Sequence, residues 1–205
     1  MKTLSRLALA ALLALAVAAP AAAQEKKKAP APAGGKDEKA AMEAWQKAMT
    51  PGEGQKKLES LVGTFDAKVR TWMDPSKPPD DSVGTSVNSW VLGDRYVQMK
   101  YEGVFLGETF NGIGYMGYDN VSKKYQGSWM DTASTGMMLS NGTMDSAGKV
   151  LTLKATTSDP ATGKVTTSDE KITIADADHH TLEMWGKTPD GKNFKMMEIQ
   201  YTRKK

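Results

Sequence analysis

The sequence predicts an all-β protein: an up-and-down antiparallel β-barrel preceded by one or two short N-terminal helices. After Gly63 the chain is rich in Thr, Val, Tyr, Trp, Met and Gly, a composition typical of strands joined by turns. Turn residues recur near positions 120, 134, 146, 161, 177 and 190, so 12 to 16 residues separate them. Such spacings leave no room for a strand together with a helical crossover, because a parallel connection needs about a dozen residues of its own.

Residues 1–24 have the pattern of a secretory signal peptide. Residues 7–19 form an unbroken run of Leu, Ala and Val, and Ala21 to Ala23 supply the small residues that a signal peptidase reads. The apolar run is shorter than the roughly 20 residues that a membrane span needs, and no cysteine follows it to carry a lipid. We therefore expect cleavage before Gln24 and a periplasmic or secreted protein without a membrane span.

Charge and cysteine content narrow the class of protein further. Removing Lys2 and Arg6 with the signal peptide leaves 25 basic against 24 acidic side chains, a net charge of +1. A nearly neutral chain gives no electrostatic reason to expect binding to nucleic acid or to a membrane surface. The sequence holds no cysteine, so we expect an ordinary hydrophobic core instead of disulfide bonds, even in an oxidising compartment.

A linker and a helical segment are expected between the signal peptide and the strands. Residues 25–37 hold mainly Lys, Pro, Ala and Gly and offer nothing to bury, so they are predicted to be a disordered linker. Residues 38–62 are predicted to be helical. In the first helix, Ala41, Trp45 and Met49 recur at helical spacing and share one face.

A second short helix is expected to begin at Thr50. Thr50 and Glu53 have the spacing of a capping box, in which each side chain accepts a hydrogen bond from the backbone of the other residue. Leu58 and Leu61 would give this helix its apolar side, and Gly63 is well placed to end it.

Residues 63–205 are predicted to form the barrel domain, with ten or eleven strands. We expect them at 64–73, 83–91, 95–102, 104–110, 112–118, 124–131, 136–144, 149–157, 165–174 and 180–187, with 194–203 closing the chain. Gly148, Gly163 and Gly191 each precede a strand, where a bulged hairpin turn needs a positive φ. A sheet of this length usually closes, because closure removes its exposed edges. A two-sheet sandwich is the alternative that the strand count allows.

One glycine-rich stretch matches a nucleotide-binding fingerprint by spacing alone. Residues 112–117, GIGYMG, have the form G-x-G-x-x-G, which holds a pyrophosphate only where a helix follows. A turn at 118–120 and another strand are expected here instead. The glycines are therefore interpreted as points of close packing beside an aromatic side chain.

The sequence offers no set of residues that identifies a catalytic or metal site. His179 and His180 are the only histidines, and neighbours on a strand point to opposite faces, so they are not expected to bind one ion together. The chain has no cysteine nucleophile and no G-x-S-x-G motif, and most carboxylates on the predicted strands are expected on the surface. We expect neither enzymatic activity nor a cofactor.

The order of several short motifs resembles that of one bacterial family. The motifs are Leu58-x-x-Leu61-Val62-Gly63-Thr64-Phe65, Gly117-Tyr118-Asp119, Gly127-Ser128-Trp129, Gly148-Lys149-Val150-Leu151 and Tyr201-Thr202-Arg203. Over about residues 53–205 they are similar to the domain of unknown function 1579 family, which is expected to form a lipocalin-like or calycin-like barrel. By this resemblance, Arg203 packs over Phe65 at the closed end of the barrel. The family has no settled activity.

We expect the barrel to bind a small apolar or amphipathic ligand. Six aromatic or methionine side chains on the predicted strands are candidate wall residues: Trp90, Tyr101, Tyr115, Trp129, Met137 and Trp185. Linings of this kind, with few polar groups, are typical of ligand cavities. The alternative is a structural or protein-interaction module of the cell envelope with a filled, ligand-free barrel. In such a module, the helix that carries Trp45 would either dock on another protein or fold back as a lid on the barrel.

Overall fold

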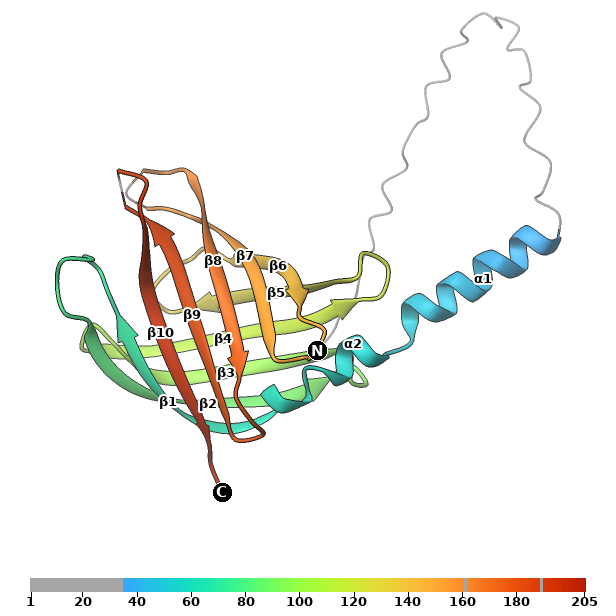
Figure 1. The fold of residues 1–205 in the computed structure, drawn as a ribbon, viewed down its shortest axis with the longest axis horizontal. Coiled ribbons are helices and arrows are strands. Elements are labelled where there is room, and N and C mark those ends of the chain that lie inside the picture. The colour runs from blue at the N-terminus through green and yellow to red at the C-terminus, as the bar shows by residue number, and fades with distance from the viewer. Residues whose placement is uncertain (1–34, 161, 189) are drawn as a thin grey trace, which may run out of the picture.

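Ten antiparallel strands close into a barrel (Figure 1). The strands are β1 (Gly63–Thr71), β2 (Asp80–Val91), β3 (Tyr96–Phe105), β4 (Glu108–Asp119), β5 (Lys124–Asp131), β6 (Met138–Met144), β7 (Val150–Ser158), β8 (Val165–Ile174), β9 (His179–Lys187) and β10 (Asn193–Arg203). Each strand pairs with its neighbour in sequence, and β1 pairs with β10 to complete the ring. The predicted up-and-down barrel is confirmed, and the sandwich is excluded.

The described part of the chain comprises residues 35–160, 162–188 and 190–205 of this computed structural model. The predicted signal peptide (1–24) lies outside the described residues, as does most of the predicted linker (25–37). The last three linker residues are an exception, because they begin a helix.

The strand prediction is wrong in one region. The sequence predicts three strands over 95–118, whereas the structure has two, β3 and β4, joined by a tight turn at Leu106 and Gly107 with φ of 50° and 85°. Gly103 and Gly112 lie inside these strands and do not end them. Each packs against an aromatic ring in a place where a side chain would not fit.

Three helical elements precede the barrel: α1 (Gly35–Met49), α2 (Glu53–Lys56) and the 3₁₀-helix η1 (Glu59–Leu61). Helix α1 projects away from the barrel (Figure 1). Its C-terminal end is tied down where Asn120 Nδ2 donates to the carbonyls of Lys47, Ala48 and Thr50, and where Arg95 Nη2 donates to the Met49 carbonyl at 2.7 Å. The rest of α1 extends into solvent.

The predicted capping box of Thr50 and Glu53 is wrong. Gly52 is the N-cap of α2, and its backbone N–H donates to Oε1 of Gln55 at 2.8 Å. Thr50 Oγ1 instead donates to the Gln46 carbonyl, at the end of α1. The competing hydrogen bond to α1 moves the start of the second helix two residues along the chain.

Residues 53–62, which we call the plug, cover one end of the barrel. Leu58 and Leu61 are buried, as predicted, in a core made of Val97, Met116, Tyr125, Leu151, Leu153, Ile172 and Ile174. Several side-chain hydrogen bonds fasten the plug, among them Asn88 Nδ2 to the Leu61 carbonyl, Gln55 Nε2 to the Tyr118 carbonyl, the Tyr125 hydroxyl to the Gly54 carbonyl, and Trp90 Nε1 to Glu59. We call this end the plugged end.

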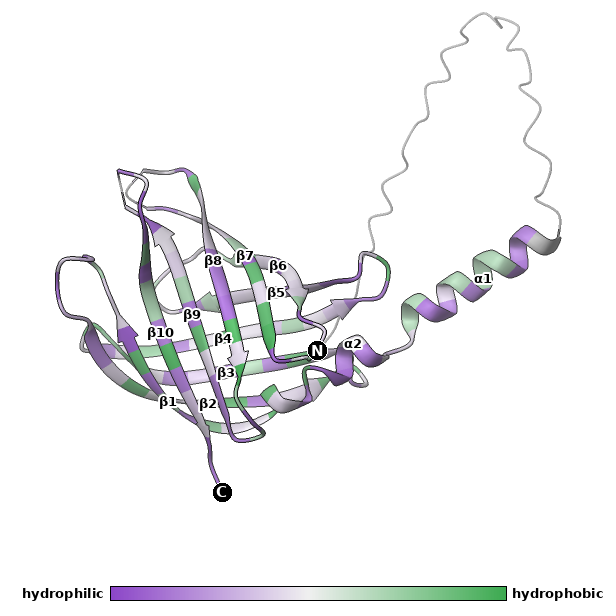
Figure 2. Ribbon diagram, viewed as in Figure 1, coloured by the Kyte–Doolittle hydropathy of each residue, from purple (hydrophilic) through white to green (hydrophobic). Residues whose placement is uncertain are grey.

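The opposite end, which we call the open end, is formed by the connections 72–79, 106–107, 132–137, 159–164 and 188–192. Along the strands between the two ends, hydrophobic and hydrophilic residues alternate (Figure 2). Since successive side chains of a strand point to opposite faces, the alternation separates an interior face from an outer face.

Candidate functional site

The interior face toward the open end is lined mainly by small residues. The strand registers place these residues there: Thr71, Ser82, Gly84, Ser86, Gly103, Gly112, Gly114, Gly127, Ser140, Ala155, Thr157 and Ser168. Larger interior side chains in this half are of two kinds. Val69, Tyr101 and Ile199 are buried, and six others are partly exposed, namely Phe105, Phe110, Trp129, Met138, Met184 and Met197. A side chain that points into a closed barrel meets solvent only through an end, so water enters here from the open end.

Two aromatic side chains in this half lie along the wall. Tyr101 packs over Gly84 and Gly103, and a Cβ at either glycine would overlap its ring. Trp129 packs in the same way over Gly112 and Gly114, and its Nε1 donates to Asp131 at 2.9 Å. A ring that packs against the backbone of a glycine lies close to the barrel wall and occupies little of the interior volume. These two residues therefore line the interior without filling it.

Glu170 is the buried ionisable group of this half. It shares the interior face of β8 with Ile172 and Ile174, and it is 5 % exposed. Burial raises the pKa of its carboxyl to about 7, and a hydrogen bond from the Ser140 hydroxyl opposes that rise. A carboxyl in this environment exchanges its proton near neutral pH.

The other ionisable side chains on the interior face of this half are also acidic. The registers place Asp80, Glu108 and Asp131 there, close to the open end. The lysines of the described strands point outward, and several pair with acids on the outer face, as Lys154 does with Asp169. The open half therefore presents carboxyl groups to its interior and, among the described residues, no lysine or arginine.

An aromatic cluster closes the plugged end. The Arg203 guanidinium lies 4.6 Å from the Phe65 ring centre, which confirms the contact expected from the family resemblance. Arg203 also donates to the carbonyls of Ser60, Val62 and Ala177, so it ties the plug to the barrel. The His180 ring stacks on Tyr201, with centres 4.4 Å apart. Burial, with a smaller contribution from Arg203, lowers the pKa of His180 to about 4, so this imidazole is neutral at pH 7.

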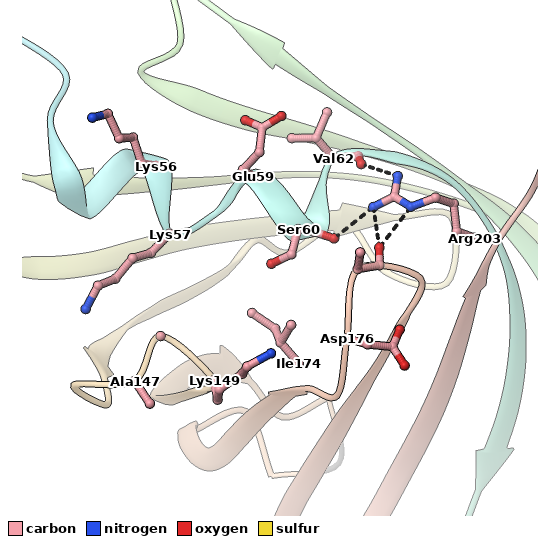
Figure 3. A pocket seen from close by; sticks show the side chains of 12 residues that line it. Lys56, Lys57, Glu59, Ser60, Val62, Ala147, Lys149, Ile174, Asp176 and Arg203 are labelled. Atoms are coloured by element: carbon pink, nitrogen blue, oxygen red, sulfur yellow. Dashed lines mark hydrogen bonds between the residues drawn. The ribbon is translucent and has the colours of Figure 1, made fainter.

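A groove of about 700 Å³ lies outside the barrel at the plugged end (Figure 3). It separates the plug from the turns at 145–149 and 175–178, and its lining includes Lys56, Lys57 and Lys149. Glu59 and Asp176 lie in the same lining and balance part of that charge. The groove is wide and open to solvent, and its Arg203 already donates to backbone carbonyls (Figure 3). It is a weaker candidate than the barrel interior.

Three of the six candidate wall residues face the barrel interior. Tyr101 and Trp129 lie in the open half, whereas Trp90 lies at the plugged end, where it donates to Glu59. Of the others, Tyr115 and Trp185 are on the outer face, where Tyr115 accepts from Gln98 and the Trp185 ring lies against Lys195.

Placing Tyr115, Trp185 and Met137 on the interior wall is therefore wrong. In the alternation of β4 and β9, the interior positions are taken by Gly114 and Gly186, next to the two aromatic residues. Met137 precedes β6 and is 51 % exposed.

Sequence reasoning missed Glu170 and Ser140. The signal for Glu170 was present, because it has the same strand parity as Ile172 and Ile174, two large apolar residues that must face a core. Ser140 gives no such signal, since its neighbours in sequence are a leucine and an asparagine that are both exposed.

The two histidines occupy different environments, as predicted from their adjacency. His179 is at the surface with Nδ1 2.9 Å from Asp176, while His180 points inward. Within the described ranges, no group of three or more His, Asp or Glu side chains is arranged to hold a metal ion. No helix in those ranges is long and apolar enough to cross a membrane.

Residues 50–203 match the model of a family described as a protein of unknown function (DUF1579). The chain belongs to the DUF1579 family. The DUF1579 match begins just after α1 and takes in the plug and the ten strands. None of the curated proteins compared with the sequence matches it.

One solved structure shows the same fold as this DUF1579 chain. The chain is similar to Rv2717c from M. tuberculosis, with a TM-score of 0.56 and 15 % identity over 76 % of this chain and 100 % of that one. A redesigned β-barrel aligns with a TM-score of 0.38 and 12 % identity, over 74 % of this chain and 96 % of its own. At this identity, the likeness to Rv2717c concerns the barrel fold.

Proposed function

We propose that the protein binds a small apolar or amphipathic molecule in the open half of the barrel and acts as a binding protein, not as an enzyme. The observation that carries this proposal is the small-residue lining of that half. Side chains just fill the interior of a barrel of about eight strands, and the diameter grows with strand number. A ten-stranded barrel lined by Gly, Ser, Ala and Thr has too little side-chain volume to fill this half in the same way.

The plugged end supports the same proposal. The plug packs on a floor of large, buried apolar side chains, while the partly exposed aromatic and methionine residues lie toward the open end. Apolar side chains that stay in contact with water are the surface a ligand covers most favourably, and methionine adapts its shape to what it covers. We expect ligand to enter between the connections of the open end.

A neutral fluorescent dye, N-phenyl-1-naphthylamine, tests the proposal. We expect saturable binding with enhanced emission and competition by decanol. Ser168→Trp would place an indole on the interior face and abolish binding, whereas Thr167→Trp, on the outer face of the same strand, would leave it intact. Absence of saturable binding to the folded wild-type protein would exclude an accessible apolar site.

We also propose that the protein is exported, so that it works in the periplasm or outside the cell. The support is the signal-peptide pattern of residues 1–24, which precede the described residues. Mass spectrometry of the protein from its own host tests this. A mature chain that begins at Gln24 in the envelope or medium is expected, and a full-length chain in the cytosol would contradict export.

A second candidate function is docking to another envelope protein through α1. Met42, Trp45 and Met49 lie on one side of this helix and are all exposed, Trp45 to 68 %. A photo-crosslinker at position 45 would then give one discrete protein adduct in the native host. The matched control is position 40, which is exposed on the opposite side of the helix. Equal labelling from both positions would exclude docking by this face.

A further inference from the structure

We propose that the ligand carries a positively charged amine, which pairs with Glu170, and that its apolar part extends from there toward the open end. This inference rests on the proposed function, because it names the chemistry of the molecule held at the same site. Three features of the site support it: the depth of Glu170, the small number of its polar partners and the sign of the surrounding charges.

Glu170 lies at the boundary between the two halves of the interior. On β8, Ile172 and Ile174 continue from it toward the plugged end, while Ser168 and Thr166 lead from it toward the open end. It is five residues from Val165, where the strand begins, or about 17 Å along the strand at ~3.3 Å per residue. A ligand that enters from the open end therefore meets Glu170 at the bottom of its path.

The carboxyl group has unused capacity to accept hydrogen bonds. An ionised carboxylate offers about four acceptor positions, and Ser140 is its one polar partner in the described residues. Its neighbours on the adjoining strands, Leu153 and Met184, are apolar. Since a buried carboxylate is costly unless it is paired, a ligand ammonium with three donors would supply the missing partners.

The remaining charges of the open half favour the same sign of ligand. Asp80, Glu108 and Asp131 face the interior along the way to Glu170, and no described lysine or arginine faces them. The basic groups on the interior face, His180 and Arg203, belong to the plugged end, beneath the apolar core. An anionic headgroup would be repelled along this path, while an ammonium would be attracted.

The apolar part of such a ligand has a surface to cover. Trp129, Phe110, Met138 and Met184 face inward on this side of Glu170 and are partly exposed. Covering them stabilises the complex by about 25 cal/mol for each Å² of apolar surface removed from water. An alkylammonium satisfies the buried carboxyl and these side chains together.

Three probes of equal chain length test the inference: decylammonium, decanol and decanoate, each displacing N-phenyl-1-naphthylamine at pH 8. We expect decylammonium to bind about tenfold or more tightly than decanol, as charge-assisted hydrogen bonds are stronger than neutral ones, and decanoate to bind most weakly. If decanol or decanoate binds as tightly as decylammonium, the amine inference is overturned while the proposed function stands. If the dye itself shows no saturable binding, the proposed function fails as well.

Two variants test whether Glu170 causes the preference for decylammonium over decanol. Glu170→Gln is expected to lower decylammonium affinity about tenfold or more and to leave decanol affinity unchanged. Glu102→Gln, on the exposed outer face of β3, is the matched control and should change neither. In the wild type, decylammonium affinity should rise from pH 5 to pH 8, because burial raises the pKa of Glu170 to about 7. A Glu170→Gln protein that keeps the full amine preference would overturn the assignment, and the three-probe comparison needs no variant at all.

Discussion

The two halves of the barrel interior are built on the same ten strands but use side chains of different size. Toward the plugged end, the interior positions carry Leu, Ile, Phe, Tyr and Met, they are buried, and the plug seals them. Toward the open end, the same faces carry mainly Gly, Ser, Ala and Thr, and most of the large residues there are partly exposed, although Val69, Tyr101 and Ile199 are buried. Strand alternation decides which residues face inward, whereas their volume decides whether that part of the interior is filled.

The halves also treat their buried ionisable groups in opposite ways. At the plugged end, His180 is held neutral between Phe65 and Tyr201, and it serves packing. In the open half, Glu170 has a single hydroxyl partner and apolar neighbours. The buried group of one half is enclosed by aromatic rings, and the buried carboxyl of the other half keeps most of its acceptor positions unused. This contrast leads to five predictions, described from the largest expected effect to the smallest.

Two phenylalanines, one in each half, give the largest expected difference. Phe65 is fully buried between Arg203 and His180, so Phe65→Ala should lower the free energy of unfolding by about 3–5 kcal/mol. Phe110 is partly exposed, so Phe110→Ala should cost about half of that or less and should weaken dye binding. Urea denaturation measures both. Equal costs would mean that the open half is as tightly packed as the plugged one.

Ionisation of Glu170, in the open half, should make the protein less stable as pH rises. In the folded state the Glu170 pKa is about 7, above its ordinary value of 4.5, so folding favours the protonated carboxyl. Its stabilising contribution is complete below pH 4.5 and is lost as pH rises through 7, a change of about 3 kcal/mol. The unfolding free energy of Glu170→Gln relative to the wild type should therefore rise by about that amount between pH 4 and pH 8. A constant difference would show that the carboxyl is solvated.

His180, at the plugged end, should make the free energy of unfolding depend on pH in the opposite direction. The His180 pKa is lowered to about 4 from 6.5, so folding favours the neutral imidazole. Its contribution is complete above pH 6.5 and is lost as pH falls through 4, again by about 3 kcal/mol. His180→Gln should thus be least destabilising in acid, and urea denaturation at pH 4 and pH 7 measures this.

The packing of the Trp129 ring over Gly112 predicts an intermediate effect on stability. A Cβ at Gly112 would overlap the Trp129 ring, so Gly112→Ala should cost about 1–3 kcal/mol and shift the tryptophan emission. Gly136 has open space around it, so Gly136→Ala should change the stability by less than about 1 kcal/mol. Thermal unfolding and fluorescence test the pair. An unchanged Gly112→Ala protein would mean that the ring has room to leave the wall.

The outer face should show the smallest effect. Trp185→Phe weakens a cation–π contact with Lys195, whose Nζ is 5.3 Å from the ring centre, so it should cost at most about 1 kcal/mol and leave dye affinity unchanged. Trp129→Phe removes the hydrogen bond to Asp131 and should weaken dye binding. Lower dye affinity in Trp185→Phe would contradict its placement outside the barrel.

The fold was predictable from the sequence because its signals are local. Turn glycines such as Gly148 and Gly163, with φ of 70° and 66°, and the apolar parity of each strand mark the hairpins directly. The signals failed where a glycine served packing instead of turning, as at Gly103 and Gly112. Their role depends on Tyr101 and Trp129, and which glycines those rings cover is fixed by cross-strand register.

The candidate site was predictable only in part, for a related reason. Choosing aromatic residues as wall residues identified Tyr101 and Trp129 but also Tyr115 and Trp185, whose glycine neighbours hold the interior positions. Sequence reasoning looked for large side chains, whereas this interior is defined by small ones. Glu170 could have been found from its parity with Ile172. The approach of Ser140 to its carboxyl, however, results from the pairing of β6 with β7 and of β7 with β8.

The pairing of β1 with β10 also governs the order of events during synthesis. Phe65 lies opposite Arg203, so the barrel wall and the clamp on the plug form only after nearly all of the strand sequence has left the ribosome. Contacts so distant in sequence form slowly. A nascent chain therefore spends an interval as a set of hairpins whose first and last strands are not yet paired.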